Sequence, residues 1–232
     1  MNFGTTVCNN FKFGAIQLSK IMFGTELVWQ IEEPAGNTIF TRGSITGSNP
    51  EYGSGSGDDF TFLVPEGFTD VTICLVGGGG GGREHSADPL IGGGSAGGSL
   101  SQIYSVTAGE VLIIHLGSGG GEFANGTATT CGTLTGSGGA AASSTIFPSG
   151  GDAPYFDCVG TQYHNGGVYC NGSGGGPGEG SPFGSGGDGG GEGCNPDRPA
   201  KAGGLGAGGG TYYGGNHPGL PGGNGQVIVS WS

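Results

Sequence analysis

Six consecutive glycines, residues 77–82, constrain what this chain can fold into more than any other feature of its sequence. Glycine loses more conformational entropy on folding than any other residue. A glycine run is therefore either a flexible spacer or a backbone that must come very close to its neighbours. The chain has 232 residues and 61 glycines, and only ten glycines precede Gly77. The glycine-rich part of the chain begins at this run, and an ordinary side-chain core is not expected after it.

Alternating apolar residues predict β-strands on both sides of the run. Residues 58–76 alternate cleanly around a turn at Gly67, which predicts a hairpin. Two further strands are predicted at 99–106 and 110–117, joined by 107–109, and a last one at 226–231. Because the two ends of a domain are often close together, the last strand is expected to pair with the first ones.

The first 57 residues are expected to form two separate pieces. Phe-Gly recurs every ten residues from Phe3 to Gly24, and the apolar residues around Gly24-Thr25 predict a hairpin with a two-residue turn. Residues 34–57 combine proline, glycine, serine and asparagine, which is typical of a linker. The predicted organisation is an attachment segment at 1–33, a linker at 34–57 and a glycine-rich domain at 58–232.

The glycine-rich domain could be disordered or could pack through its backbone. Disorder is the usual expectation for a segment with so few large apolar residues. The alternative is the three-residue-per-turn extended helix, which makes no hydrogen bonds to itself and must find partners on neighbouring segments. Between Gly172 and Gly193, every third residue is glycine except Ser181. The fold class we predict is mainly β, with a small sheet that continues into a packed array of polyglycine II helices.

Composition excludes several classes of function. The chain has six basic residues and a net charge of −12, so a phosphate-binding surface is not expected and nucleic acid is an improbable partner. No apolar run is long enough to span a membrane, and no basic and apolar leader is present at the N-terminus, which predicts synthesis in a cytoplasm. The six cysteines show no regular spacing and are expected to remain mostly reduced.

No motif predicts catalysis, a metal or a cofactor. The pattern GxGxxG arises by chance where one residue in three is glycine, and the four histidines are far apart. Asp188 and Glu192 lack the spacing of calcium-binding repeats, and we interpret Asp58 and Asp59 as surface acids rather than a hydrolytic pair. The chain is therefore predicted not to be an enzyme.

Aromatic residues within glycine-rich loops are the best candidates for a binding site. Tyrosine provides a large contact area with little entropy to lose, and glycine, asparagine and histidine often accompany it in recognition loops. These aromatics could equally fill gaps between glycine segments. The candidate loops are 154–170 and 211–218, with 83–91 as a weaker third. The candidate residues are Tyr155, Phe156, Tyr163, His164, Tyr169, Tyr212, Tyr213, Asn216 and His217.

The order of these features resembles a known family. "FTFLVPEGFTDVTICLVGGGGGG", "GGGSAGGSLSQIYSVTAGEVLIIHLGSGGG" and "GGNGQVIVSW" together resemble the glycine-rich domain of bacteriophage tail-fibre and receptor-binding proteins. The alternation of glycine runs with variable loops is similar to the tip adhesin of T-even-type phage long tail fibres. That resemblance implies a sandwich of polyglycine helices that displays receptor-binding loops at one end.

The resemblance also implies a function and partners. It predicts a virion protein, a tail-fibre or tail-tip adhesin that binds a bacterial cell-surface protein or polysaccharide. Residues 1–33 would attach it to tail-fibre or tail proteins, a trimeric fibre among them. The alternative is a virion structural protein, such as a head decoration, tail connector or spacer, that binds no receptor.

Overall fold

The computed structural model describes residues 34–83, 93–142, 202–210 and 219–232 in full. It also gives the backbone of short strands within 11–30 and at 84–85, 190–191 and 212–213. Two five-stranded antiparallel sheets dominate the described part of the chain.

Both sheets are built from strands that are far apart in sequence. The first sheet has the order β11 (Ser99–Ser105), β9 (Asp70–Val76), β17 (Gln226–Trp231), β5 (Gly36–Thr41) and β6 (Ser44–Thr46). The second has the order β14 (Leu134–Gly136), β13 (Thr129–Cys131), β12 (Val111–His115), β8 (Asp59–Leu63) and β7 (Gly53–Ser56). The predicted strand at 226–231 is confirmed, and so is its pairing with the first part of the domain, because β17 pairs with β9.

The two sheets pack face to face around one hydrophobic core. Alternate residues of each strand point inward, so the period of two in the sequence becomes one buried face per sheet. Phe40 of the first sheet and Phe60 of the second lie with ring centroids 5.6 Å apart. The largest fully buried side chains are Phe40, Phe62, Ile73, Leu75, Ile114 and Leu116.

The hairpin predicted for 58–76 is wrong. β8 and β9 are both strands, but β8 pairs with β7 and β12 in one sheet and β9 pairs with β11 and β17 in the other. β11 and β12 likewise belong to different sheets. The connections at 64–69 and 106–110 therefore cross between the layers. Alternation of apolar residues predicts that one face of each strand is buried, but it does not predict which strand pairs with which.

The stretch 34–57, which its composition assigns to a linker, contains three strands and one 3-10 helix, η1 (Pro50–Tyr52). Phe40 of β5 is completely buried, and β5 pairs along its length with β17. The Asn37 side chain accepts a hydrogen bond from the Ser48 backbone N–H, and the Ser48 hydroxyl accepts one from the Asn37 N–H. Small polar residues here close tight turns against the sheet, so their composition resembles that of a linker.

The N-terminal residues that are described form two hairpins. β1 (Phe11–Phe13) pairs with β2 (Ile16–Leu18), and β3 (Lys20–Phe23) pairs with β4 (Glu26–Gln30). Phe23 lies opposite Glu26, so two residues, Gly24 and Thr25, join the strands. The predicted hairpin around Gly24-Thr25 is confirmed.

The glycine run continues directly from β9 and contacts neighbours on every side. Its six N–H groups all donate to backbone carbonyls at 2.8 to 3.0 Å, and every third residue donates to the same neighbouring segment. Gly77 donates to Gly98 and Gly80 to Ser95, in one segment. Gly78 donates to Thr127 and Gly81 to Ala124, in a second. Gly79 donates to Gly223 and Gly82 to Leu220, in a third. Three further segments donate to the carbonyls of the run, through Gly120 and Phe123, Gly139 and Ala142, and Gly209.

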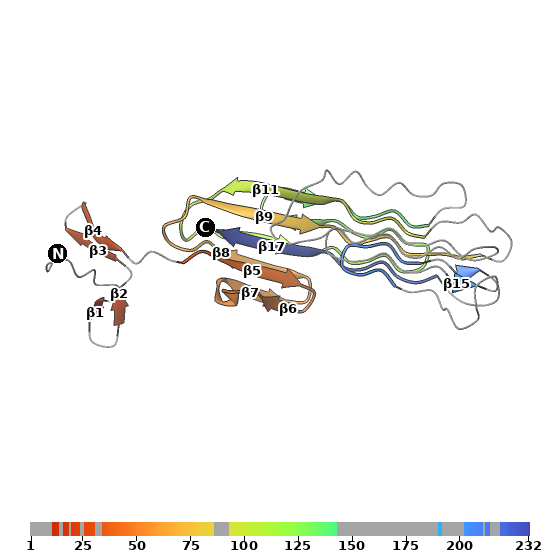
Figure 1. Cartoon of the computed structure of the whole chain (residues 1–232), viewed down its shortest axis with the longest axis horizontal. Helices are drawn as coiled ribbons and strands as arrows, with labels where there is room; N and C mark the ends of the chain where they lie inside the picture. Colours follow the sequence, from red (N-terminus) through yellow and green to blue (C-terminus); the bar gives the residue numbers. More distant parts are fainter. Residues whose placement is uncertain are drawn as a thin grey trace.

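Six segments form a closed ring around the run. Hydrogen bonds connect each to the next in the order 93–98, 137–142, 124–127, 117–121, 219–225 and 206–210, and 206–210 bonds back to 93–98. We call the run and these six the glycine segments. Five of the six adjoin a strand of the sandwich, so Figure 1 shows the strands continuing into the glycine segments. Sheets that pack through side chains lie about 10 Å apart, whereas here backbone bonds join the continuations of both sheets directly.

Close approach explains why glycine is required in the run. A Cβ atom built on any residue from Gly77 to Gly82 would overlap a carbonyl oxygen of a neighbouring segment; at Gly80 that oxygen belongs to Ala140. Residues 77–82 are buried throughout. The six glycines are therefore the centre of a packed array, and their N–H groups are satisfied there without any side-chain core.

The structure describes two of the six cysteines, which the sequence predicts to be mostly reduced. Cys131 is free, as expected, and it is fully buried, whereas Cys74 is disulfide-bonded. The other four cysteines, Cys8, Cys158, Cys170 and Cys194, lie outside the described residues. Burial raises the pKa of the Cys131 thiol from 9.0 to about 12, so this thiol remains protonated and unreactive in the folded protein.

We expect Gly80→Ala to destabilise the protein strongly, by about 3 kcal/mol, because the added methyl group must displace the Ala140 carbonyl and break hydrogen bonds on both sides. The matched control is Gly121→Ala, since nothing lies within 4 Å of a Cβ at Gly121. Its effect should remain within about 0.5 kcal/mol. Urea unfolding of the three proteins measures both values, and equal destabilisation by the two substitutions would contradict the packed array.

We also expect a specific loss of stability at alkaline pH. Between pH 9 and 12 the unfolded Cys131 thiol ionises while the folded thiol does not, so the free energy of unfolding falls as the pH rises. The contribution is about 1.4 kcal/mol per pH unit. Cys131→Ala lacks this contribution, so its stability should approach that of the wild type between pH 9.5 and 10.5. Parallel stability curves for the two proteins would show that the thiol does not titrate as proposed.

Candidate binding surface at the end of the glycine segments

The glycine segments end at a surface opposite the C-terminus and the start of the sandwich. Trp231 pairs with Gly36, and the Trp231 indole N–H donates to the Pro34 carbonyl at 3.1 Å. The C-terminus and the start of the sandwich therefore lie at one end (Figure 1). At the other end, Gly82 bonds to Leu220 and Gly210 accepts from Leu220. We call this end of the glycine segments the distal end.

Three stretches of chain interrupt the described structure at or near the distal end. The described chain stops at residues 83, 142 and 210, and residues 82, 142 and 210 each bond to a neighbouring segment at this level. The candidate loops 83–91, 154–170 and 211–218 all fall within these interruptions, apart from residue 83 itself. The described residues at which these interruptions begin thus lie at one end of the glycine segments.

Of the nine predicted binding residues, the structure describes only the backbone of two. Tyr212 and Tyr213 form β16 (Tyr212–Tyr213), which pairs in parallel with β10 (Glu84–His85) and with β15 (Gly190–Gly191). Figure 1 shows β15 at the end away from the C-terminus. The other seven lie outside the described residues: Tyr155, Phe156, Tyr163, His164, Tyr169, Asn216 and His217. Pairing of β16 brings two of the three candidate loops together, 83–91 and 211–218.

A turn at the distal end contains residues that the sequence analysis did not select. Ala124 N–H donates to the Gly121 carbonyl at 3.0 Å, which closes a β-turn with Glu122 and Phe123 at its centre. Phe123 is 56% exposed, and the Arg83 guanidinium carbon lies 5.4 Å from the centroid of its ring. The Glu122 carboxylate accepts a hydrogen bond from the Gly219 N–H at 3.1 Å. The sequence signal that could have identified this turn is an aromatic residue between two glycine-rich stretches, in "GSGGGEFANG".

The two acidic residues Asp58 and Asp59 each lie beside a basic side chain. Asp58 lies 3.1 Å from the Arg42 guanidinium, and Asp59 lies 2.8 Å from Nδ1 of His115. The Asp59 side chain is 86% exposed, so solvent screens its interaction with His115. Within the described residues, no group of three or more histidine, cysteine, aspartate or glutamate side chains could hold a metal ion.

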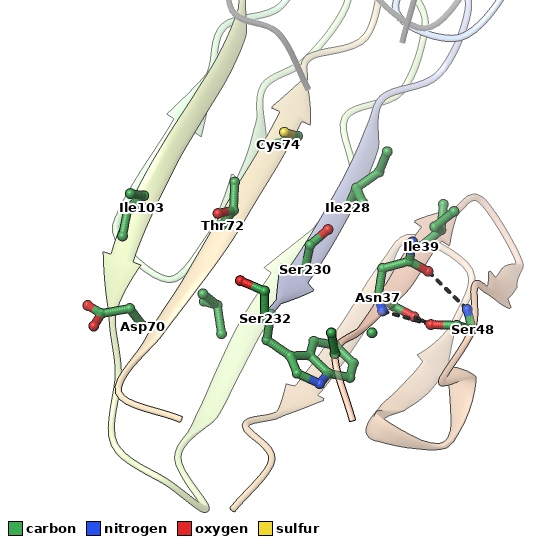
Figure 2. A pocket seen from close by; sticks show the side chains of 14 residues that line it. Asn37, Ile39, Ser48, Asp70, Thr72, Cys74, Ile103, Ile228, Ser230 and Ser232 are labelled. Carbon is green, nitrogen blue, oxygen red and sulfur yellow. Dashed lines mark hydrogen bonds between the residues drawn. The ribbon is translucent and has the colours of Figure 1, made fainter. Parts of the chain in front are cut away.

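A shallow groove of about 670 Å³ lies on the outer face of the first sheet, away from the distal end (Figure 2). Ile39, Ile103 and Ile228 line it together with small polar residues such as Thr72 and Ser230. Asp70 is its one acidic residue and accepts hydrogen bonds from the Ser105 and Thr69 hydroxyls. The groove therefore offers a mixed sheet surface and no pair of groups suited to acid–base chemistry.

Comparisons with known proteins identify no family for this chain. No protein-family description matches the sequence, and no curated protein matches it either. In the part of the chain that the structure describes, no helix is long and apolar enough to cross a membrane.

Proposed function

We propose that the glycine segments are polyglycine II helices packed side by side. The support is the period of three: residues three apart in the run donate to the same neighbour, as expected for a helix with three residues per turn. A central segment surrounded by six neighbours has the hexagonal packing that such a helix allows. In this proposal the array is a rigid rod that extends the sandwich.

We further propose that the protein is a bacteriophage adhesin at the tip of a tail fibre or tail. The observation that carries this proposal is the separation of the two ends. The termini of the sandwich lie at one end, where residues 1–33 would attach to tail-fibre or tail proteins. The interruptions that contain the aromatic candidate loops begin at the other end. Loops held by a rigid scaffold are where binding sites usually occur.

The proposed role is binding rather than catalysis. Asp58 lies beside Arg42 and Asp59 beside His115, and the glycine segments present mainly backbone. Specificity must then come from side chains in the loops and turns at the distal end. The proposed ligand is a bacterial cell-surface molecule, and the proposed location is the virion after synthesis in the host cytoplasm.

We expect the double substitution Tyr212→Ala and Tyr213→Ala to weaken binding to host cells at least tenfold, about 1.4 kcal/mol, because aromatic anchors dominate many interfaces. Purified protein should compete with phage for adsorption, and the variant should compete less well. The control is Ile113→Ala, which removes an exposed side chain from the sandwich. All three proteins should melt at similar temperatures.

Two outcomes would change the proposal. If the wild-type protein does not block adsorption, the alternative of a structural virion protein without a receptor becomes the better explanation. If it blocks adsorption but the tyrosine variant blocks equally well, binding remains and β16 is not part of the contact surface.

A further inference from the structure

Phe123 has a backbone conformation that is unusual for its residue type. Its φ is +56°, in the left-handed region, and it is the second central residue of the turn closed by Gly121 and Ala124. Turns with a positive φ at this position normally require glycine or asparagine. For a bulky residue this conformation costs about 1–2 kcal/mol.

Elsewhere in the described structure, glycine avoids this cost. Among the described residues, every other position with a positive φ is glycine: Gly43, Gly47, Gly55, Gly57, Gly67, Gly109, Gly132 and Gly206. A quarter of the chain is glycine, so a glycine at position 123 would be unremarkable in composition and better for the backbone. A phenylalanine there indicates that its side chain has a use.

That use is not burial in a core. Phe123 is 56% exposed, at the distal end of the glycine segments. Its ring is nevertheless held in place, because Arg83 stacks over one face and the Phe123 N–H donates to the Gly82 carbonyl at 3.2 Å. Glu122, the preceding residue, is fixed by the N–H of Gly219. The result is a preorganised aromatic ring that is more than half exposed and has a guanidinium over one face.

We propose that Phe123 is a ligand-binding residue whose exposed ring stacks on a sugar ring of a bacterial surface polysaccharide. This rests on the proposed adhesin function and specifies the chemical class of its ligand. A pyranose ring has an apolar face of C–H groups and an edge of hydroxyl groups. A binding site for a pyranose ring therefore needs one flat aromatic surface with polar groups around that surface.

The surroundings of Phe123 have that composition. Arg83 lies over the ring, and the turn that carries Phe123 also presents the Glu122 carboxylate and the backbone groups of Gly121 and Ala124. The other exposed large hydrophobic side chains in the described part of the chain are on sandwich strands: Leu63, Ile103, Val111 and Ile113. No contiguous apolar patch surrounds Phe123 within the described residues, whereas the buried centre of a protein interface usually is one.

The test compares the full-length wild type with Phe123→Gly and Phe123→Tyr. Glycine removes the ring and relieves the backbone, so Phe123→Gly should melt at the same temperature as the wild type or higher. A residue with a structural role would give the opposite result. Tyrosine retains the ring and should retain binding.

Binding is measured on intact susceptible cells and on a panel of immobilised lipopolysaccharides and capsular polysaccharides purified from them. We expect the wild type and Phe123→Tyr to bind the cells and at least one polysaccharide, and Phe123→Gly to bind both at least tenfold more weakly. Ile113→Gly, at a similarly exposed site on the sandwich, is the control for loss of a surface side chain.

The outcomes separate this inference from the proposed function. If the wild type binds cells and Phe123→Gly binds them equally well, the role of Phe123 is overturned and the adhesin proposal remains. If Phe123→Gly loses cell binding but no polysaccharide is bound and protease treatment of the cells abolishes binding, the ligand is a protein and the sugar assignment is wrong. If the wild type binds neither cells nor polysaccharide, both proposals fail.

Discussion

The structure depends on backbone hydrogen bonds between segments that approach too closely for side chains. Each N–H of residues 77–82 donates to a neighbour, and a Cβ at any of these residues would overlap a carbonyl oxygen. Each such bond contributes about 1 kcal/mol net, and leaving one unmade in the interior would cost more. The array is therefore strongly directional, since every donor has to face one of the neighbouring segments. It also explains how a chain with 61 glycines can have an ordered interior beyond its sandwich.

The sandwich and the glycine segments hold neighbouring parts of the chain together in two different ways. In the sandwich, hydrogen bonds lie within each sheet and apolar side chains such as Phe40 and Phe60 fill the space between sheets. Beyond Val76, hydrogen bonds also join segments that continue different sheets, and no side-chain layer remains between them. The side-chain core anchors the strands in register, and the strands then deliver the glycine segments to positions where their backbones can pair. Each part thus fixes the geometry of the other.

The scarcity of side chains in the glycine segments limits which residues at the distal end could recognise a ligand. Glycine segments contribute almost no side chains to a surface, so any specific recognition has to come from the few residues that interrupt them. The turn at Glu122 and Phe123 is such an interruption, and the strand pairing of Tyr212 and Tyr213 with 84–85 and 190–191 is another. In the proposed function, a rigid array behind these residues reduces the entropy that they lose on binding.

The sequence by itself determined the strands at 226–231 and around Gly24-Thr25 and the start of the glycine-rich part at Gly77, because alternation, turn residues and glycine content are local signals. It did not determine that β8 and β9 lie in different sheets or that residues 36–56 belong to the sandwich. Strand pairing connects distant residues, and a period of two specifies a buried face without naming the neighbour. The glycine segments indicate even less about their neighbours, because residues without side chains show no alternation of apolar and polar positions. Only the tertiary structure decided which segments surround residues 77–82 and that Phe123 lies in an exposed turn with a positive φ at their end.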